Sequence, residues 1–256
     1  QNTASIDTAF VHQFGMDLRL SAKTADFAPF SLQDLAAGMR IENGRASFDV
    51  GDSTLMGGRA TGRISLSEQG IRGGGRLQMS LGDVDIGAIV STLALPGPLP
   101  SGRGSADFEL STERPLWATT LSDVSGQFRL RMGAGTLNHF NRQAFEERAG
   151  QNAFFNFSEA ADGSFDFVRA DVEAKLDRGL AELTKAEIEG NEKILALSGM
   201  IPYRSGSVAL AGSLADRPQA DATAVVNPTI SFFVGGSWPE PVISPISILT
   251  GQQPSQ

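Results

Sequence analysis

The amino-acid sequence contains no cysteine, one tyrosine, two tryptophans and two histidines among its 256 residues. The lack of cysteine excludes disulfides, thiolate metal sites and cysteine nucleophiles. Tyrosine and tryptophan supply the rings on which sugars usually stack, so their scarcity argues against a carbohydrate-binding surface. Neither histidine, His12 or His139, has a partner at metal-ligand spacing, and we therefore expect no metal site.

Long apolar runs are also missing, since no stretch of about 18 apolar residues would cross a bilayer as a helix. Asp and Glu number 29 against 21 Lys and Arg, which gives a net charge of −8. An acidic chain is poorly suited to binding nucleic acid, or to binding an anionic membrane through a polybasic patch. Because the sequence starts at Gln1 without a signal-peptide pattern, we interpret it as an excised fragment with residues 1–14 as its leader segment.

The sequence is rich in period-two alternation of apolar and polar residues, which predicts β-strands with one apolar and one polar face. Clusters of Gly, Asp, Asn and Ser separate successive strands, and such short links favour antiparallel pairing. The strongest turn signal is Asn43-Gly44, because both residues tolerate positive φ. The alternating apolar positions include Met16, Leu18, Leu20, Met39, Ile41, Ala46, Phe48, Val50, Ile64, Leu66, Phe165, Phe167, Val172, Leu195 and Leu197.

Only two segments have helical character. Residues 85–93 predict a short helix, capped by Asp83 or Asp85 and stopped by the prolines that follow. Residues 138–155 predict a second helix, because Phe and Ala recur there at roughly helical spacing. Residues 95–100 contain three prolines and predict a linker or sharp corner.

Together these patterns predict a mainly β fold: a curved, mostly antiparallel sheet that forms a groove, with one or two short helices. We expect one β domain over residues 15–249, which could be subdivided at the proline-rich corner. The last residues, 250–256, are polar and predict a disordered tail.

The sequence offers little for catalysis. It has no Gly-x-Ser-x-Gly elbow and no Ser-x-x-Lys motif. Neighbouring Glu146 and Glu147 lie on the predicted helix, where adjacent side chains do not face one another. A pair of carboxylates assembled from distant strands stays open. We expect a protein that is not an enzyme, with no catalytic residues and no cofactor.

Five motifs in order carry a family resemblance. They lie at residues 55–66 (LMGGRATGRISL), 83–86 (DVDI), 121–135 (LSDVSGQFRLRMGAG), 195–199 (LALSG) and 234–245 (VGGSWPEPVISP). With them, the sequence resembles the AsmA-like C-terminal domain over residues 15–249. It departs from that pattern in a phenylalanine-rich segment at 140–157.

The resemblance implies an envelope protein of Gram-negative-type bacteria with a role in outer-membrane biogenesis. It implies a periplasmic location, with the full-length protein anchored in the inner membrane by a helix that this sequence does not include. The family is thought to be related to bridge-like, chorein-type lipid transfer proteins, in which a bent sheet forms a groove for acyl chains.

Two functions follow from these expectations. In the first, an apolar β-groove shields or conducts the acyl chains of a phospholipid or other lipid between inner and outer membrane. In the second, the domain is a non-catalytic scaffold for outer-membrane assembly, with envelope proteins as partners. Without the resemblance, the alternation favours an ordinary sandwich core over a lipid groove. For the first function, the predicted groove lining comprises Leu77, Met79, Leu81, Phe108, Leu110, Phe128, Leu130, Met132, Val208 and Leu210.

Overall fold

A computed structural model describes residues 16–42, 45–95, 97–218 and 228–246 of the chain. Within these residues, strands dominate and two short α-helices are present. The mainly β, antiparallel fold class is therefore confirmed. The predicted leader at 1–14, the turn at Asn43-Gly44 and the predicted tail at 250–256 lie outside the described residues.

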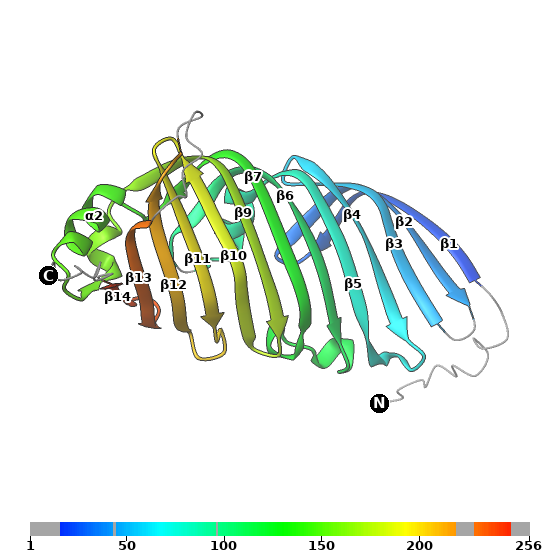
Figure 1. The fold of residues 1–256 in the computed structure, drawn as a ribbon. Helices are drawn as coiled ribbons and strands as arrows, with labels where there is room; N and C mark the ends of the chain where they lie inside the picture. The colour runs from blue at the N-terminus through cyan, green and yellow to red at the C-terminus, as the bar shows by residue number, and fades with distance from the viewer. Residues whose placement is uncertain (1–15, 43–44, 96, 219–227, 247–256) are drawn as a thin grey trace, which may run out of the picture. The chain divides into compact units, whose positions relative to one another are not determined.

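The described strands form one fourteen-stranded antiparallel sheet with two ends (Figure 1). Their order is β1-β2-β3-β4-β5-β6-β7-β9-β10-β11-β12-β13-β14-β8, so nearly every strand pairs with its neighbours in sequence. Short links between strands lead to this meander, as the turn signals indicate. The strands are β1 (Met16–Phe27), β2 (Phe30–Glu42), β3 (Arg45–Leu55), β4 (Gly58–Ser67), β5 (Gly70–Asp85), β6 (Leu99–Thr112), β7 (Ser125–Asn138), β8 (Phe155–Asn156), β9 (Ser164–Asp177), β10 (Leu180–Gly190), β11 (Lys193–Ile201), β12 (Ser207–Asp216), β13 (Pro228–Ser237) and β14 (Val242–Ile246).

The chain divides into two compact units. Unit 1 contains the chain up to Leu93, together with residues 104–130 and 175–179. Unit 2 contains residues 94–103, 131–174 and 180 onward. Strands β6, β7 and β9 contribute residues to both units. The first boundary falls beside the proline-rich corner, and the extent of the domain stays a prediction.

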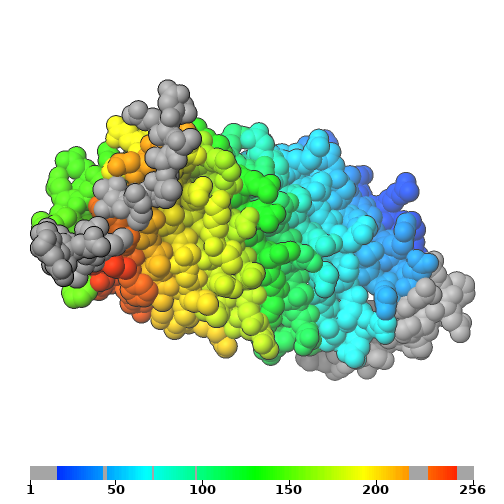
Figure 2. Space-filling model, in the orientation of Figure 1, coloured from blue at the N-terminus to red at the C-terminus, as the bar shows by residue number. Residues whose placement is uncertain are grey.

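Unit 1 is built on consecutive hairpins. β1 and β2 pair from Phe27↔Phe30 outward through a two-residue turn, and β2 and β3 pair up to Glu42↔Arg45. The register shifts once or more within each of the pairs β2–β3, β3–β4 and β4–β5. Such bulges bend a strand and increase its twist. In the space-filling view, residues of β3 and β4 reach the visible surface (Figure 2).

Helix α1 (Ile86–Thr92) follows β5 in unit 1, and it confirms the helix expected at 85–93. The side chain of Asp85 accepts a hydrogen bond from the backbone N–H of Ala88 at 3.0 Å. This bond satisfies one of the N–H groups that the first helical turn leaves unpaired.

Helix α2 (Arg142–Gly150) belongs to unit 2 and is shorter than the expected 138–155. It begins where the Asn141 side chain accepts a hydrogen bond from the backbone N–H of Ala144 at 3.0 Å. It ends before Asn152, whose φ of 52° lies in the left-handed region and cannot continue the helix. The phenylalanines that follow belong instead to β8 and to a 3₁₀ turn, η4 (Phe157–Ala160).

A cluster of buried aromatic rings holds α2 against the sheet of unit 2. Phe145 of α2 lies 4.8 Å from Phe232 of β13 and 5.7 Å from Phe155 of β8, between ring centroids. Phe140 lies 5.5 Å from Phe145 and 6.0 Å from Phe165. We call these five residues the phenylalanine cluster. Neither described helix has the length and apolar character needed to cross a membrane.

Candidate functional site

A row of large apolar side chains crosses the first five strands of unit 1. Each residue stands directly opposite the next, from Leu18↔Met39 and Met39↔Phe48 to Phe48↔Ile64 and Ile64↔Leu77. We call these five residues the apolar row. A parallel line runs beside it through Leu20, Ala37, Val50, Gly62 and Met79. Because side chains alternate across a sheet, both lines lie on the same face.

The apolar row is not sealed by the described part of the chain. Leu18 is 51% exposed and Ile64 is 37% exposed. Met39, Phe48 and Leu77 are half-buried. A row that stays in contact with solvent on one face of a sheet is unusual for a packed core, where large apolar residues are fully covered.

The opposite face of the same strands is charged. Arg63 and Asp49 form a hydrogen-bonded ion pair across β4 and β3. Arg45 pairs with Glu68 at 2.6 Å. A further pair across β2 and β1 joins Arg40 to Asp17. These pairs are largely exposed, so they add little stability, but they show that this face is polar.

Seven of the predicted lining residues lie in unit 1. Leu81 and Leu130 are buried, with 5% and 7% exposure. The rings of Phe108 and Phe128 pack against each other across β6 and β7, tilted by 37° with centroids 5.0 Å apart. Leu77 and Met79 extend the apolar row and the parallel line to β5. Five of the seven are half-buried: Leu77, Met79, Phe108, Leu110 and Phe128.

The other three predicted lining residues, Met132, Val208 and Leu210, lie in unit 2 and are buried. Leu210 stands opposite Val234, and the neighbouring pair on the same face is Gly212↔Phe232. Val208 and Leu210 thus share the face on which Phe232 meets α2. Whether any of the ten residues contacts lipid stays a prediction.

A match to a protein-family model identifies the family of this chain. The model of the AsmA family matches residues 2–186, well over half of the chain. The chain belongs to the AsmA family. Membership indicates a role related to the cell envelope. The match does not extend to the motifs at 195–199 and 234–245. Searches of curated proteins and of solved structures found no match to this AsmA-family chain.

The lining predicted for this AsmA-family domain begins at Leu77. It does not include Leu18, Met39, Phe48 and Ile64, although the alternation of these residues was recognised. The register of the hairpins supplied the missing signal, because a two-residue turn fixes which residues of two strands face each other. Counting outward from Phe27↔Phe30 pairs Leu18 with Met39.

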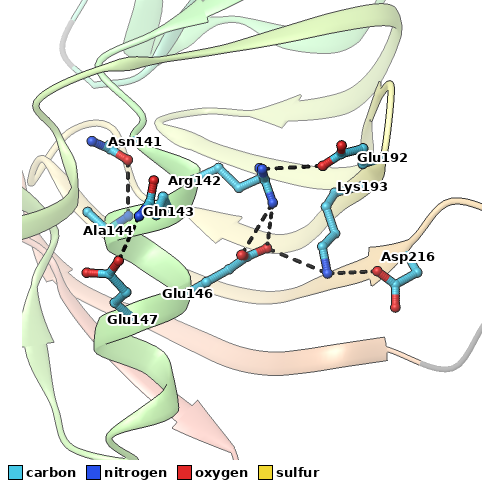
Figure 3. Close-up of polar contacts among 9 residues, drawn as sticks. All are labelled: Asn141, Arg142, Gln143, Ala144, Glu146, Glu147, Glu192, Lys193 and Asp216. Atoms are coloured by element: carbon cyan, nitrogen blue, oxygen red, sulfur yellow. Dashed lines mark hydrogen bonds and ion pairs between the residues drawn. The ribbon is translucent and has the colours of Figure 1, made fainter.

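In unit 2, the outer side of α2 is tied to β11 and β12 by charged side chains (Figure 3). Lys193 pairs with Asp216 at 2.8 Å and with Glu146 at 3.6 Å. The hydrogen bond that Lys193 donates to the carboxylate of Asp216 is the main reason that the pKa of Lys193 is raised. Arg142 also pairs with Glu146, at 3.2 Å, and with Glu192, at 3.4 Å.

A polar cleft of about 330 Å³ lies beside this network. Arg142, Asp166 and Lys193 are among its lining residues, and the two cations already pair with carboxylates. The described residues contain no group of three or more His, Cys, Asp or Glu that could hold a metal ion. Every buried side-chain nitrogen or oxygen of the described residues has a hydrogen-bond partner. We therefore interpret this network as a structural one, whose ion pairs fix α2 to β11 and β12.

Proposed function

We propose that the apolar row of unit 1 shields the acyl chains of a phospholipid during lipid traffic between inner and outer membrane. The observation that carries the proposal is the in-register apolar row, open to solvent on a sheet whose other face is charged. An apolar sheet face must be covered by something that is not water. An acyl chain can cover this face by non-covalent contact alone.

The dimensions of the row support this role. Neighbouring strands lie about 4.8 Å apart, so a row across five strands extends for about 19 Å. This length is comparable with that of an extended acyl chain. Each methylene that leaves water contributes about 0.8 kcal/mol, so even partial burial of one chain would hold a lipid. The thioether of Met39 and the ring of Phe48 suit a lining that adapts to different chains.

A matched pair of variants tests the proposal. Ile64→Asp puts a charge in the apolar row, and Ser65→Asp puts the same charge on the opposite face of the same strand. The purified protein is extracted with organic solvent, and its phospholipid is quantified by mass spectrometry. We expect lipid with wild type and Ser65→Asp, and a loss of at least about tenfold with Ile64→Asp, because a charge opposes apolar burial. Equal lipid in both variants, or none in wild type, would count against the proposal.

We propose that the domain works in the periplasm, held to the inner membrane in the full-length protein. Family membership supports an envelope location at the coarser level. A reporter fused to this domain in the full-length protein tests the compartment. We expect activity from a fused reporter enzyme that works only after export. We expect no activity from a fused reporter enzyme that works only in the cytoplasm. The reverse pattern would contradict the proposed location.

The alternative role as an assembly scaffold is favoured by β1. This twelve-residue strand ends the sheet, and among the described strands it pairs only with β2. An edge strand offers backbone donors and acceptors to a strand from another chain. A lipid-free preparation that captures an outer-membrane assembly protein through β1 would favour the scaffold.

A further inference from the structure

The connection between β6 and β7 exposes large apolar side chains at the surface of unit 1. We define this connection as residues 113–124. It contains two 3₁₀ turns, η2 (Leu116–Ala118) and η3 (Leu121–Asp123). Trp117 is 65% exposed and Leu121 is 64% exposed. Polar residues usually occupy such connections, so these two side chains need a physical reason.

The connection holds its shape through its own hydrogen bonds. The carboxylate of Asp123 accepts hydrogen bonds from the backbone N–H and the hydroxyl of Thr120, at 2.9 and 2.8 Å. It also accepts one from Arg114 at 2.8 Å. The hydroxyl of Thr119 donates to the carbonyl of Pro115 at 3.0 Å. The apolar side chains are therefore presented by an ordered backbone, and little conformational entropy would be lost when they bind.

Four charges at the connection form two opposite-sign pairs, and exposed Glu113 adds a negative charge. Arg114 pairs with Asp123 within it. The neighbouring turn between β9 and β10 carries a second pair, Arg178 with Asp177 at 3.1 Å. That turn is joined to the connection because the backbone N–H of Arg178 donates to the carbonyl of Val124 at 3.0 Å. Paired charges reduce the penalty for approaching a medium of low polarity.

We propose that the β6–β7 connection seats Trp117 and Leu121 in the interfacial region of a lipid bilayer. An indole has an apolar body and one N–H donor, and it settles at the boundary between headgroups and acyl chains. Leu121 adds apolar area, and the paired charges remain at the headgroup level. This inference rests on the proposed function only for the choice of a bilayer over a protein, since a lipid-shielding domain must meet a membrane.

The test uses vesicles of palmitoyl-oleoyl phosphatidylcholine and the fluorescence of Trp117. The chain has two tryptophans, and Trp238 is half-buried against Phe157 with ring centroids 5.9 Å apart. Subtracting the spectrum of W117F from that of wild type isolates Trp117 while Trp238 is left in place. On addition of vesicles, we expect the Trp117 emission to shift to shorter wavelength and to be quenched by brominated acyl chains.

Vesicle flotation supplies the second measurement. The double variant Trp117→Ala with Leu121→Ser should lower the partition coefficient roughly tenfold, because most of the inserted apolar area is lost. Phe154→Ala, which removes a ring that is 77% exposed in unit 2, should leave partition unchanged. Adding phosphatidylglycerol should not strengthen binding, since both local cations are paired with carboxylates, Glu113 is negative and the net charge is −8.

An unshifted Trp117 emission in a folded protein, checked by circular dichroism, would overturn the inference. So would a double variant that floats as well as wild type, or binding that requires anionic lipid. Capture of a protein through Trp117 without any vesicle effect would assign the connection to a protein partner instead. Co-purified lipid reports on the apolar row and flotation reports on this connection, so either proposal can fail without the other.

Discussion

Asp123 accepts three of the hydrogen bonds within the β6–β7 connection. The hydrogen bonds from Thr120 and Arg114 lower its pKa from 3.8 to about 2, with the backbone N–H of Thr120 as the largest cause. A carboxyl whose pKa is lowered on folding stabilises the fold when it is ionised. Its contribution is therefore complete above about pH 4 and is lost as the pH falls towards 2.

We expect the environment of Trp117 to change in this acid range. The emission of Trp117 is obtained as the wild-type spectrum minus the W117F spectrum, and it should be constant near neutral pH. It should change as the pH falls from about 4 to 2, because protonated Asp123 no longer accepts the hydrogen bonds that hold the connection. Asp123→Asn should give the acid-form emission already at neutral pH. A Trp117 signal that is insensitive to both changes would show that Asp123 does not fix the connection.

At the scale of elements, Phe145 is the ring of α2 that packs on the sheet of unit 2. Phe145 is 1% exposed and contacts rings from β8 and β13. Its truncation leaves a cavity that the surrounding rings cannot fill without moving. We expect Phe145→Ala to lower the free energy of unfolding by about 3–5 kcal/mol, measured by chemical denaturation.

Phe154→Ala is the control for this effect. Its ring is 77% exposed, so the free energy of unfolding should change by no more than about 0.5 kcal/mol. Lipid retention in unit 1 should also survive Phe145→Ala wherever the protein stays folded, because the apolar row belongs to β1–β5 of unit 1 and α2 belongs to unit 2. Similar destabilisation by the two truncations would mean that the phenylalanine cluster does not anchor α2.

At the scale of the whole molecule, the two units use the same alternating strands differently. In unit 2 the apolar face carries α2 and the phenylalanine cluster, and Leu214 and Ile243 are fully buried. In unit 1 the apolar row remains partly exposed among the described residues. The phenylalanine-rich departure from the family pattern at 140–157 therefore has a structural reason, since it supplies the cover of unit 2.

Much of this fold could be predicted because the signals are local. Alternation fixes the strands, and Asp85 marks the start of α1 through a hydrogen bond to a residue three positions away. The predicted end of α2 was wrong because Phe154 keeps roughly helical spacing in the sequence but lies beyond the helix, directly before β8. The choice between a covered and an uncovered face depends on contacts such as Phe145 with Phe232, which are far apart in sequence. No local pattern encodes that contact.

The central claim is that acyl chains lie on the apolar row, and site-specific photo-crosslinking tests it most directly. A benzophenone amino acid replaces Phe48, which points into the row, or Ser47, its neighbour on the opposite face of β3. After irradiation of the protein in cells, mass spectrometry reports any phospholipid attached to it. The account predicts lipid adducts at position 48 and few or none at position 47. Adducts at both positions alike, or at neither, would contradict it.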